Sequence, residues 1–513
     1  MSEVMRVKPS LIDLSGIRAK LTPWRVAVKD YESGKSYTYR ELDERACRLA
    51  SLLAEHGVGK GDRVCVIAPN MVEYIDAYFA CCKLGAVLAP LNTRLALPEL
   101  EAYFKLLEPS ALIYSPEHVK EASELAKVQR LKVILSAGGE LIEGAKAYSL
   151  VEGYPSSFER RSVGWEDPVM ILQTGGTTGV PKGAILSHRA VLWNALNTVL
   201  SWGLRDDDVA PLYFPLFHTG GWNVITIPLF YVGGRIVLIR KFTPDLALEV
   251  IEREKCTVVI AVPTMFHMMA RSRRFRETDF SSVRFFKSGG GMSSLSLVKE
   301  YWSRGAMYFQ GYGLTEVGPN VFYTPPEAMR EKPMSVGRAA LFTEAKIVKE
   351  DGSEAKPGEE GELWLRGPMA FSGYWRMPDE TRETLTEDGW VKTGDIMRMD
   401  EEGYFYFVER KKFMYKSGGE NVYPAEVVEA LLQHPAVEEA AVIGVPDEKW
   451  GEVGKAIVAV KEGMEVTKEE LVAFLRERIA RYKVPKHFVF VKELPKTGVG
   501  KVDIKRIREI YGA

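Results

Sequence analysis

The segment Thr174-Gly175-Gly176-Thr177-Thr178-Gly179-Val180-Pro181-Lys182-Gly183 directly follows an apolar run at 169–172. A strand that opens into glycines, threonines and one lysine can surround phosphate oxygens with backbone N–H groups, hydroxyls and a cation. It differs from the P-loop of NTPases, because Pro181 precedes Lys182 and Gly183 follows it. The pattern predicts a phosphate-binding turn at the end of a buried strand, although such a loop can also be an ordinary turn.

Helical patterns alternate with short apolar runs on both sides of this segment. Thr38 and Glu41 form a capping box that predicts a helix ending at Gly57, followed by a buried strand at 64–68. A second helix at 71–84 precedes an apolar run at 86–90. This alternation predicts α/β layers around a largely parallel sheet.

The pattern changes towards the C-terminus. From about Ala345, short strand-like pieces separated by turn signals predict an antiparallel β subdomain. The last hundred residues predict a small α+β unit with helices at 426–433 and 468–480 and strands at 439–445, 455–460 and 487–491. We therefore expect an α/β protein with a large domain at 1–409 and a small C-terminal domain at 410–513.

Composition excludes several classes of protein. The chain has 513 residues, 46% of them hydrophobic, which is enough for two or more globular domains. The 68 basic and 69 acidic residues give no net field that would attract nucleic acid. No apolar run has the length of a membrane span, and residues 1–10 lack the apolar core of a signal peptide. The five cysteines show no CxxC pair and are expected to be reduced core residues of a cytoplasmic protein.

Further motifs supply polar groups suited to a nucleotide. The segment at 310–316, Gln-Gly-Tyr-Gly-Leu-Thr-Glu, offers an aromatic face, a hydroxyl and a carboxylate. The segment at 392–395 is expected to end a strand with Asp395, whose carboxylate suits a ribose diol. The segments at 361–367 and 373–375 are expected to be structural. Near the C-terminus, the glycine-rich turn at 495–501 ends in Lys501.

In this order, and over essentially the whole chain, these motifs resemble the adenylate-forming superfamily of acyl-CoA synthetases, peptide synthetase adenylation domains and beetle luciferases. The resemblance implies that the small C-terminal domain is mobile. It also implies a reaction in two steps. A carboxylate first attacks the α-phosphorus of ATP to give an acyl-adenylate and pyrophosphate, and a thiol then displaces AMP.

The resemblance also assigns roles by position. Lys501 would bridge the α-phosphate and the carboxylate, Thr315 would bond phosphate, and Glu316 would bind Mg²⁺. The remaining ATP and AMP contacts would come from Thr174, Gly175, Gly176, Thr177, Thr178, Gly179, Lys182, Gly290, Gly291, Tyr312, Gly313, Asp395 and Arg410. In this set, Tyr312 would stack on adenine and Asp395 would hold the ribose hydroxyls.

Substrate contacts are open between a functional and a structural interpretation. Relatives that take plain carboxylic acids commonly carry a histidine at the position of His218, where amino-acid-activating domains carry an aspartate, so His218 argues against an amino acid substrate. The structural alternative is a hydrogen-bonded core histidine. Trp222, Asn223, Val224 and Val317 are further candidates for the acyl pocket or the core. Gly418, Gly419 and Trp450 resemble a tunnel for the CoA arm, with an ordinary turn as the alternative.

Three positions depart from the family pattern. Gly175 stands where a serine is usual, which removes one hydroxyl from the phosphate loop. Met292 stands where proline is common. Phe413 stands where the hinge residue is usually Asp or Lys, so that the pivot is expected at Lys412, at Phe413 or within a residue or two of them.

We therefore predict a cytoplasmic, AMP-forming acyl-CoA synthetase that uses ATP, Mg²⁺ and CoA to activate a fatty or other apolar carboxylic acid. One alternative is a stand-alone domain that loads a carrier protein, which is less favoured because the printed sequence ends at Ala513, shortly after Lys501. Another is a catalytically dead acyl or nucleotide sensor, against which the presence of Lys501, Glu316 and Asp395 argues. A luciferase is disfavoured. Chain length, aryl or alkyl character and oligomeric state stay open, with a homodimer among the options.

Overall fold

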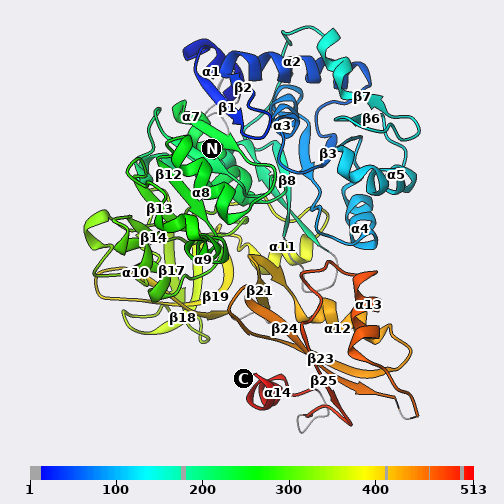
Figure 1. Ribbon diagram of the computed structural model, residues 1–513, viewed down its shortest axis with the longest axis vertical. Coiled ribbons are helices and arrows are strands. Elements are labelled where there is room, and N and C mark those ends of the chain that lie inside the picture. Colours follow the sequence, from blue (N-terminus) through cyan, green and yellow to red (C-terminus); the bar gives the residue numbers. More distant parts are fainter. Residues whose placement is uncertain (1–12, 175–180, 411–413, 462, 497–501, 513) are drawn as a thin grey trace. The chain divides into compact units, whose positions relative to one another are not determined.

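The computed structural model describes residues 13–174, 181–410, 414–461, 463–496 and 502–512. The chain divides into two compact units (Figure 1). The first comprises Met1–Thr93, Phe104–Gln173 and Gly183–Glu409, and the second comprises Arg94–Tyr103, Thr174–Lys182 and Arg410–Ala513. The domain border at residue 410 and the independent motion of the two domains stay predictions.

A seven-stranded sheet contains the predicted α/β layers. Its order is β7-β6-β5-β3-β4-β8-β9, and the pairs from β7 to β8 are parallel. Every residue of β4 and β5 is buried, as expected for strands covered on both faces. The strands are β3 (Arg63–Ile67), β4 (Val87–Pro90), β5 (Ala111–Tyr114), β6 (Val133–Ser136), β7 (Lys146–Ala147), β8 (Pro168–Thr174) and β9 (Lys182–Ser187).

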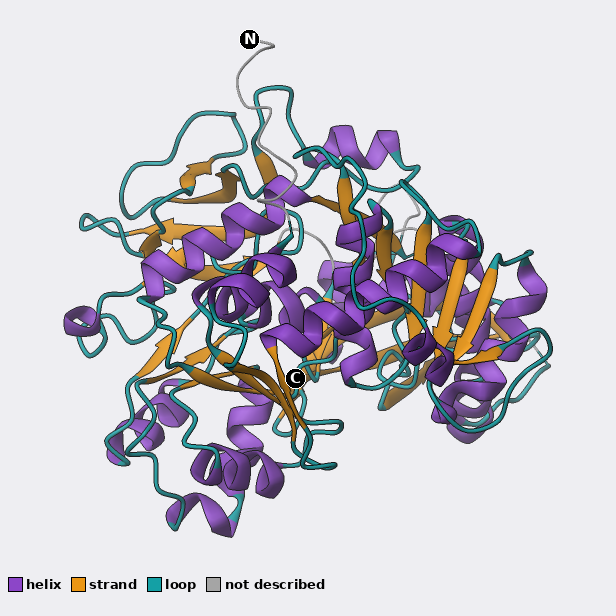
Figure 2. Ribbon diagram, turned by 90° about the horizontal axis from the view of Figure 1, so that it is seen from above, coloured by secondary structure: helices purple, strands orange, loops and turns teal. Residues whose placement is uncertain are grey.

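The helices predicted in this region are confirmed. Helix α2 (Tyr39–Glu55) begins with the expected capping box of Thr38 and Glu41. The other helices here are α1 (Leu14–Leu21), α3 (Val72–Leu84), α4 (Leu97–Leu107) and α5 (Val119–Val128), with 3-10 turns η2 (Pro116–His118) and η3 (Tyr148–Gly153). Figure 2 shows strands of the first unit layered between helices.

Two further sheets complete the α/β part of the first unit. One has the order β10-β11-β1-β2, and the other, β12-β13-β14, is wholly parallel. Their strands are β1 (Val26–Asp30), β2 (Ser36–Thr38), β10 (Val209–Leu212), β11 (Arg235–Leu238), β12 (Val258–Ala261), β13 (Phe285–Ser288) and β14 (Tyr308–Gln310). Ligands of such sheets bind beyond the carboxyl ends of the strands, which here lie at Ser288 and Gln310.

Helices accompany these strands along the chain. They are α6 (His188–Trp202), the π-helix η4 (Gly220–Val224), α7 (Thr226–Val232), α8 (Pro244–Arg253), α9 (Pro263–Arg271), the 3-10 turn η5 (Arg273–Arg276) and α10 (Leu295–Ser303). Single-turn π-helices often occur at functional sites, and η4 contains three of the acyl-pocket candidates, Trp222, Asn223 and Val224.

The predicted antiparallel β subdomain is confirmed. Strands β17 (Glu344–Val348), β18 (Glu360–Arg366), β19 (Val391–Met399) and β20 (Phe405–Arg410) form one sheet in chain order. Strand β18 pairs antiparallel with both β17 and β19. Its residues alternate in burial, which is typical of a sheet with one covered face. Beside it lie β15 (Phe322–Tyr323), β16 (Arg338–Ala339), η6 (Pro326–Ala328) and α11 (Pro378–Thr384).

The second unit contains the expected α+β elements. A five-stranded sheet has the order β22-β21-β24-β23, with β25 paired to β24. Its strands are β21 (Tyr415–Ser417), β22 (Glu420–Val422), β23 (Val437–Asp447), β24 (Gly451–Val460) and β25 (His487–Val491), and its helices are α12 (Pro424–Leu432), α13 (Lys468–Arg476) and α14 (Ile504–Tyr511). Each predicted element is present, with α13 four residues shorter than expected at its end.

Two expectations from composition can be compared with the structure. All five cysteines are buried free thiols, as predicted for core residues. In the parts of the chain that the structure describes, no helix combines the length and apolar character needed to cross a bilayer.

Candidate functional site

The turn that follows β14 is built on close backbone contacts. A Cβ atom on Gly311 would lie 2.5 Å from the carbonyl oxygen of Ser288, and one on Gly313 would lie 2.2 Å from the carbonyl carbon of Pro319. The amide of Leu314 donates to the carbonyl of Gly318 at 3.2 Å, which turns the chain back on itself. Glycine is therefore required at 311 and 313, because any side chain there would collide with the neighbouring backbone.

Tyr312 and Asp395 meet in the structure. The Tyr312 hydroxyl donates to Oδ2 of Asp395 at 2.5 Å, although the two residues are 83 positions apart. Both side chains are buried. The Tyr312 ring also packs edge-on against Phe322, with centroids 5.8 Å apart. Two motifs predicted to bind the same nucleotide are thus joined by a direct hydrogen bond.

Asp395 does not end a strand, and this expectation was wrong. It lies in the middle of β19, where the pairing with β18 shifts register between Glu362 and Trp364. Gly394 has a φ of +69°, and its amide donates to Oε1 of Glu362 at 3.0 Å. A β-bulge of this kind re-aims a side chain, which explains how a residue inside a strand is directed towards Tyr312.

The Glu316 side chain is hydrogen-bonded to Tyr374, a residue of the segment at 373–375 that was expected to be purely structural. The Tyr374 hydroxyl donates to Oε1 of Glu316 at 2.8 Å, and the Phe371 amide donates to the Glu316 carbonyl at 2.8 Å. Among the described residues, Oε2 of Glu316 has no hydrogen-bond partner. Thr315, next to it, is half-buried. Tyr374 therefore positions the Glu316 carboxylate. The only signal for this role in the sequence is that Tyr374 directly follows Gly373.

The glycine loop after β13 is anchored at its C-terminal end by two hydrogen bonds between Ser293 and Gln310. The Ser293 amide donates to Oε1 of Gln310 at 3.1 Å, and Nε2 of Gln310 donates to the Ser293 carbonyl at 3.0 Å. Gly290 has a φ of +74°, a conformation that favours glycine. The backbone of Gly290 and Gly291 is thus placed beside the turn that contains Tyr312.

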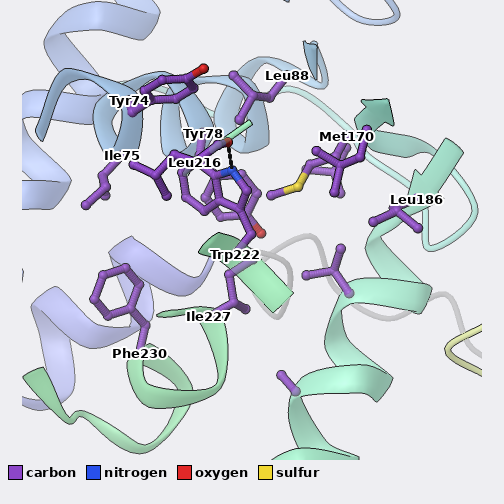
Figure 3. Close-up of a cluster of buried hydrophobic side chains, with 14 of the residues drawn as sticks. Tyr74, Ile75, Tyr78, Leu88, Met170, Leu186, Leu216, Trp222, Ile227 and Phe230 are labelled. Atoms are coloured by element: carbon purple, nitrogen blue, oxygen red, sulfur yellow. Dashed lines mark hydrogen bonds between the residues drawn. The ribbon is translucent and has the colours of Figure 1, made fainter. Parts of the chain in front are cut away.

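Trp222 lies inside the hydrophobic core. It has no solvent-exposed surface, its Nε1 donates to the carbonyl of Leu216 at 2.6 Å, and its ring lies 5.1 Å from that of Tyr78. Figure 3 shows this cluster, in which Trp222 is surrounded by side chains from several helices and strands. In this conformation Trp222 supports the fold, and its role in an acyl pocket stays a prediction.

The other acyl-pocket candidates differ in exposure. His218 is half-buried, and its ring packs against Phe217 at 4.6 Å. Asn223 is buried and its side-chain amide donates to Oγ1 of Thr219 at 3.1 Å, while no group in the described part of the chain donates to its Oδ1. Val317 is buried and Val224 half-buried. A pocket role for these residues stays a prediction.

Gly418 and Gly419 form the two-residue loop of the β21–β22 hairpin. Their φ values are +60° and +88°, as such tight turns require. The Gly418 amide donates to the carbonyl of Trp450 at 2.9 Å, and a Cβ on Gly418 would lie 2.9 Å from that indole ring. The tunnel candidates therefore lie together at the hairpin tip.

Several predicted residues lie outside the described part of the chain. They are Gly175, Gly176, Thr177, Thr178 and Gly179 of the phosphate loop, Lys412 and Phe413 of the hinge, and Lys501. The ends of the phosphate loop are described. Thr174 ends β8 with a buried hydroxyl for which the described residues provide no hydrogen-bond partner, and the buried Lys182 begins β9. Arg410 is the last residue of β20.

Lys287 is a buried lysine that the sequence analysis missed. It lies in β13 with 5% of its surface exposed, and its Nζ is 4.8 Å from the centroid of the Trp202 ring. Burial lowers the pKa of Lys287 to about 7. The signal available in the sequence was a charged residue inside the strand Phe285-Phe286-Lys287-Ser288, directly before the glycine loop.

The described residues include no group of three or more His, Cys, Asp and Glu side chains suited to a metal ion. Mg²⁺ commonly uses only one or two protein carboxylates together with waters and substrate phosphates. A single carboxylate held in place by Tyr374, as Glu316 is, fits that mode of binding.

Two family models match this chain. The family model "AMP-binding enzyme" matches residues 17–375, and "AMP-binding enzyme C-terminal domain" matches residues 426–501. A feruloyl-CoA synthase from Amycolatopsis is 40% identical over 96% of this chain and 98% of its own length. The long-chain-fatty-acid–CoA ligase FadD13 of Mycobacterium tuberculosis is 33% identical over 97% of each chain.

A solved structure also matches nearly the whole chain. The amide bond synthetase McbA from Marinactinospora thermotolerans superimposes with a TM-score of 0.88 at 30% identity, covering 95% of this chain and 97% of its own.

Proposed function

The chain belongs to the family of AMP-binding enzymes and is an ATP-dependent, AMP-forming acyl-CoA ligase, and from this premise we propose that its preferred acid is aromatic. The acid carboxylate attacks the α-phosphorus of ATP and expels pyrophosphate. The CoA thiol then attacks the acyl carbon of the adenylate, loses its proton and releases AMP.

The aromatic character of the acid is supported by the relatives. Identity to the feruloyl-CoA synthase is 40%, against 33% for the long-chain-fatty-acid ligase, over comparable coverage. His218 in place of an acidic residue offers no partner for an ammonium group, which argues against amino acids. A fatty acid is the competing substrate class, and it would align the protein with lipid metabolism.

The hydrogen bond between Tyr312 and Asp395 is the observation that carries the nucleotide assignment. It ties an aromatic ring suited to a base to a carboxylate suited to a ribose diol. A restrained pair of this kind presents both groups without the loss of rotamer freedom that loose side chains would incur on binding. We assign adenosine to this pair, with the backbone of Gly290 and Gly291 beside it.

The charged part of ATP is assigned to Thr174 and Lys182, at the two ends of the phosphate loop, and to Glu316. Lys182 and the Thr174 hydroxyl would contact phosphate oxygens, and Glu316 would hold Mg²⁺ in the position fixed by Tyr374. Mg²⁺ would offset the charge that develops on the pyrophosphate leaving group. Thr315 is assigned to phosphate, and Lys501 to the junction of α-phosphate and carboxylate.

Pyrophosphate release tests the proposal. The enzyme with MgATP is offered ferulate, benzoate, octanoate or palmitate, one acid at a time. We expect the highest kcat/KM with an aromatic acid. A higher kcat/KM for octanoate or palmitate would contradict the proposal and favour the fatty acid class.

A second stage distinguishes the thiol acceptor. The adenylated enzyme is offered either CoA or a phosphopantetheinyl carrier protein. Thioester formed faster on CoA supports the ligase, whereas faster loading of the carrier would favour the alternative of a stand-alone adenylating domain.

A further inference from the structure

Two serines at opposite ends of the glycine loop are joined by their side chains. Ser288 ends β13, and Oγ of Ser293 donates to Oγ of Ser288 at 2.9 Å. The Tyr308 hydroxyl lies 2.6 Å from Oγ of Ser293. Because a hydroxyl has a single O–H group and that of Ser293 is used on Ser288, the tyrosine is the donor in this second bond. All three side chains are buried, so the two ends of the loop are closed by hydroxyl groups that are removed from solvent.

Gln310 holds the same end of the loop through the backbone. Its side-chain amide has an acceptor and a donor side by side, and these pair with the N–H and the carbonyl of the single residue Ser293. Gln310 is in register with Ser288 across β13 and β14. Tyr308 lies two residues before Gln310 and is therefore on the same face of β14. The two parallel strands thus place three buried polar side chains around residue 293.

Between these buried ends, the loop is exposed to solvent at Gly290. At its start, the amide of Gly289 donates to the carbonyl of Ala261 at 3.1 Å. A Cβ atom on Gly290 would lie 3.4 Å from Cγ1 of Val262, so the loop rests on that side chain. An exposed tip between two anchored ends can contact a ligand with its backbone while its ends stay in place.

Three consecutive glycines give the loop little stiffness of its own. Glycine adopts both signs of φ readily, and Gly290 has a φ of +74°. The polar groups that glycines offer to a ligand are the N–H and C=O groups of the backbone, and rotation of a peptide unit replaces a donor by an acceptor at the same place. The orientation of these groups at the tip therefore depends on the contacts that hold the two ends.

We infer that Ser293, Tyr308 and Gln310 are positioning residues that fix the glycine loop and thereby set the preference of the site for adenine over guanine. This inference rests on the function proposed above, which assigns adenosine beside the loop, and adds a determinant of base specificity to it. Adenine presents an amino donor where guanine presents a carbonyl acceptor. A peptide group held in one orientation pairs with one of these bases and is left unpaired by the other, whereas a loop that rotates freely adapts to both.

The test measures kcat/KM for pyrophosphate release with MgATP and with MgGTP, using the acid that gives the highest rate, and compares the ratio of the two values. Tyr308→Phe removes only the hydroxyl, because the ring stays packed against Phe266 and Tyr301 at 5.0 and 5.1 Å. We expect this variant to lower the ratio by roughly 5-fold, and Gln310→Met, which removes both backbone contacts, to lower it by roughly 10- to 50-fold. The KM for ATP should rise in both variants while the KM for the acid stays at the wild-type value.

Tyr301 provides a matched control in the same aromatic cluster. It is also buried, and its hydroxyl donates to the carbonyl of Phe266 at 3.0 Å, away from the glycine loop. Tyr301→Phe should lower Tm by an amount similar to Tyr308→Phe and leave the ratio for ATP and GTP unchanged. Ser293→Ala is a second mild variant, which breaks the link to Ser288 and should also lower the ratio, so that the test does not depend on Gln310→Met folding.

A wild-type ratio in both Tyr308→Phe and Ser293→Ala would overturn the inference and leave the ligase function intact. An equal fall of the ratio in Tyr301→Phe, or a wild-type enzyme that uses ATP and GTP equally well, would overturn it too. If no acid releases pyrophosphate, the proposed function fails by itself. The inference is then tested by calorimetric titration of MgATP and MgGTP, where a weaker preference for ATP in Tyr308→Phe than in the wild type supports it and an equal preference rejects it.

Discussion

Replacing Lys287 with methionine should stabilise the folded protein in the absence of substrate. The pKa of Lys287 falls from the ordinary value of 10.5 to about 7 on burial. At about 1.36 kcal/mol per pKa unit this difference corresponds to ~5 kcal/mol of destabilisation when the lysine is charged. The attraction of the ammonium to the Trp202 ring, ~1 kcal/mol, is lost in the variant, so we expect a net gain of ~2 to 4 kcal/mol.

The gain should depend on pH in a defined direction. Between pH 7 and 10.5 the unfolded chain binds the Lys287 proton more tightly than the folded chain, so stability of the wild type rises with pH over this window. Below about pH 7 the full cost is present, and above 10.5 it vanishes. Thermal denaturation at pH 6 and pH 10 should therefore show a larger rise in Tm for Lys287→Met at pH 6.

Lys83 is a second buried lysine, for which we expect the opposite change in stability on replacement with methionine. It is also buried, at 2% exposure, but its Nζ pairs with Asp43 at 2.6 Å and with Asp13 at 3.1 Å. These carboxylates raise the pKa of Lys83 despite its burial, whereas no carboxylate among the described residues compensates the burial of Lys287. Lys83→Met should lower stability by ~3 to 5 kcal/mol, because it leaves carboxylates without their cation. A fall in Tm for both variants, or a gain in Lys287→Met of equal size at pH 6 and pH 10, would refute this reasoning.

The remaining predictions concern catalysis. Glu316→Gln should reduce pyrophosphate release and raise the Mg²⁺ concentration needed for half-maximal rate, and unchanged behaviour in a Mg²⁺ titration would reject the metal assignment. Tyr374→Phe should lower the rate by roughly 2- to 10-fold, since it removes one hydrogen bond that positions Glu316; equal rates would show that this bond is dispensable. His218→Ala should change the preference among acids if the residue gates the pocket, whereas a lower Tm with the same preference would assign it to the core. Lys501→Ala should slow adenylation by a factor on the order of 10² to 10³ while retaining thioester formation from preformed acyl-adenylate. Gly418→Leu should retain adenylation and slow thioester formation, because a Cβ atom there lies 2.9 Å from the Trp450 ring and the backbone has a φ of +60°. Loss of both half-reactions in both folded variants would reject alternation between two faces of the C-terminal domain.

The layered fold was predictable because its signals are local. Periodicity, the capping box at Thr38 and turn residues after Ala345 each act within a few positions, and the structure has the corresponding helices and strands. The observed ends of some elements differ from the predicted ones by a few residues, because helix ends depend on tertiary packing, as at the end of α13.

The candidate site was predictable in its motifs but not in its contacts. The meeting of Tyr312 with Asp395 depends on a register shift between β18 and β19, which no local pattern encodes. Likewise, Tyr374 is hydrogen-bonded to Glu316, 58 positions away in the sequence. The pattern of apolar and polar residues around Tyr374 does not indicate that partner. Such contacts arise from the tertiary arrangement of strands whose local sequences are compatible with several registers.

Lys287 illustrates the same limit from the side of energetics. A lysine between Phe286 and Ser288 in a buried strand contradicts the local hydrophobic pattern, and such conflicts in natural proteins concentrate at functional sites. Its energetic cost arises from the tertiary structure, because burial removes the ammonium from water and its contact with the Trp202 ring, at 4.8 Å, returns only about 1 kcal/mol. The sequence therefore marks position 287 as unusual, whereas the size of its effect on stability depends on the side chains that pack around it.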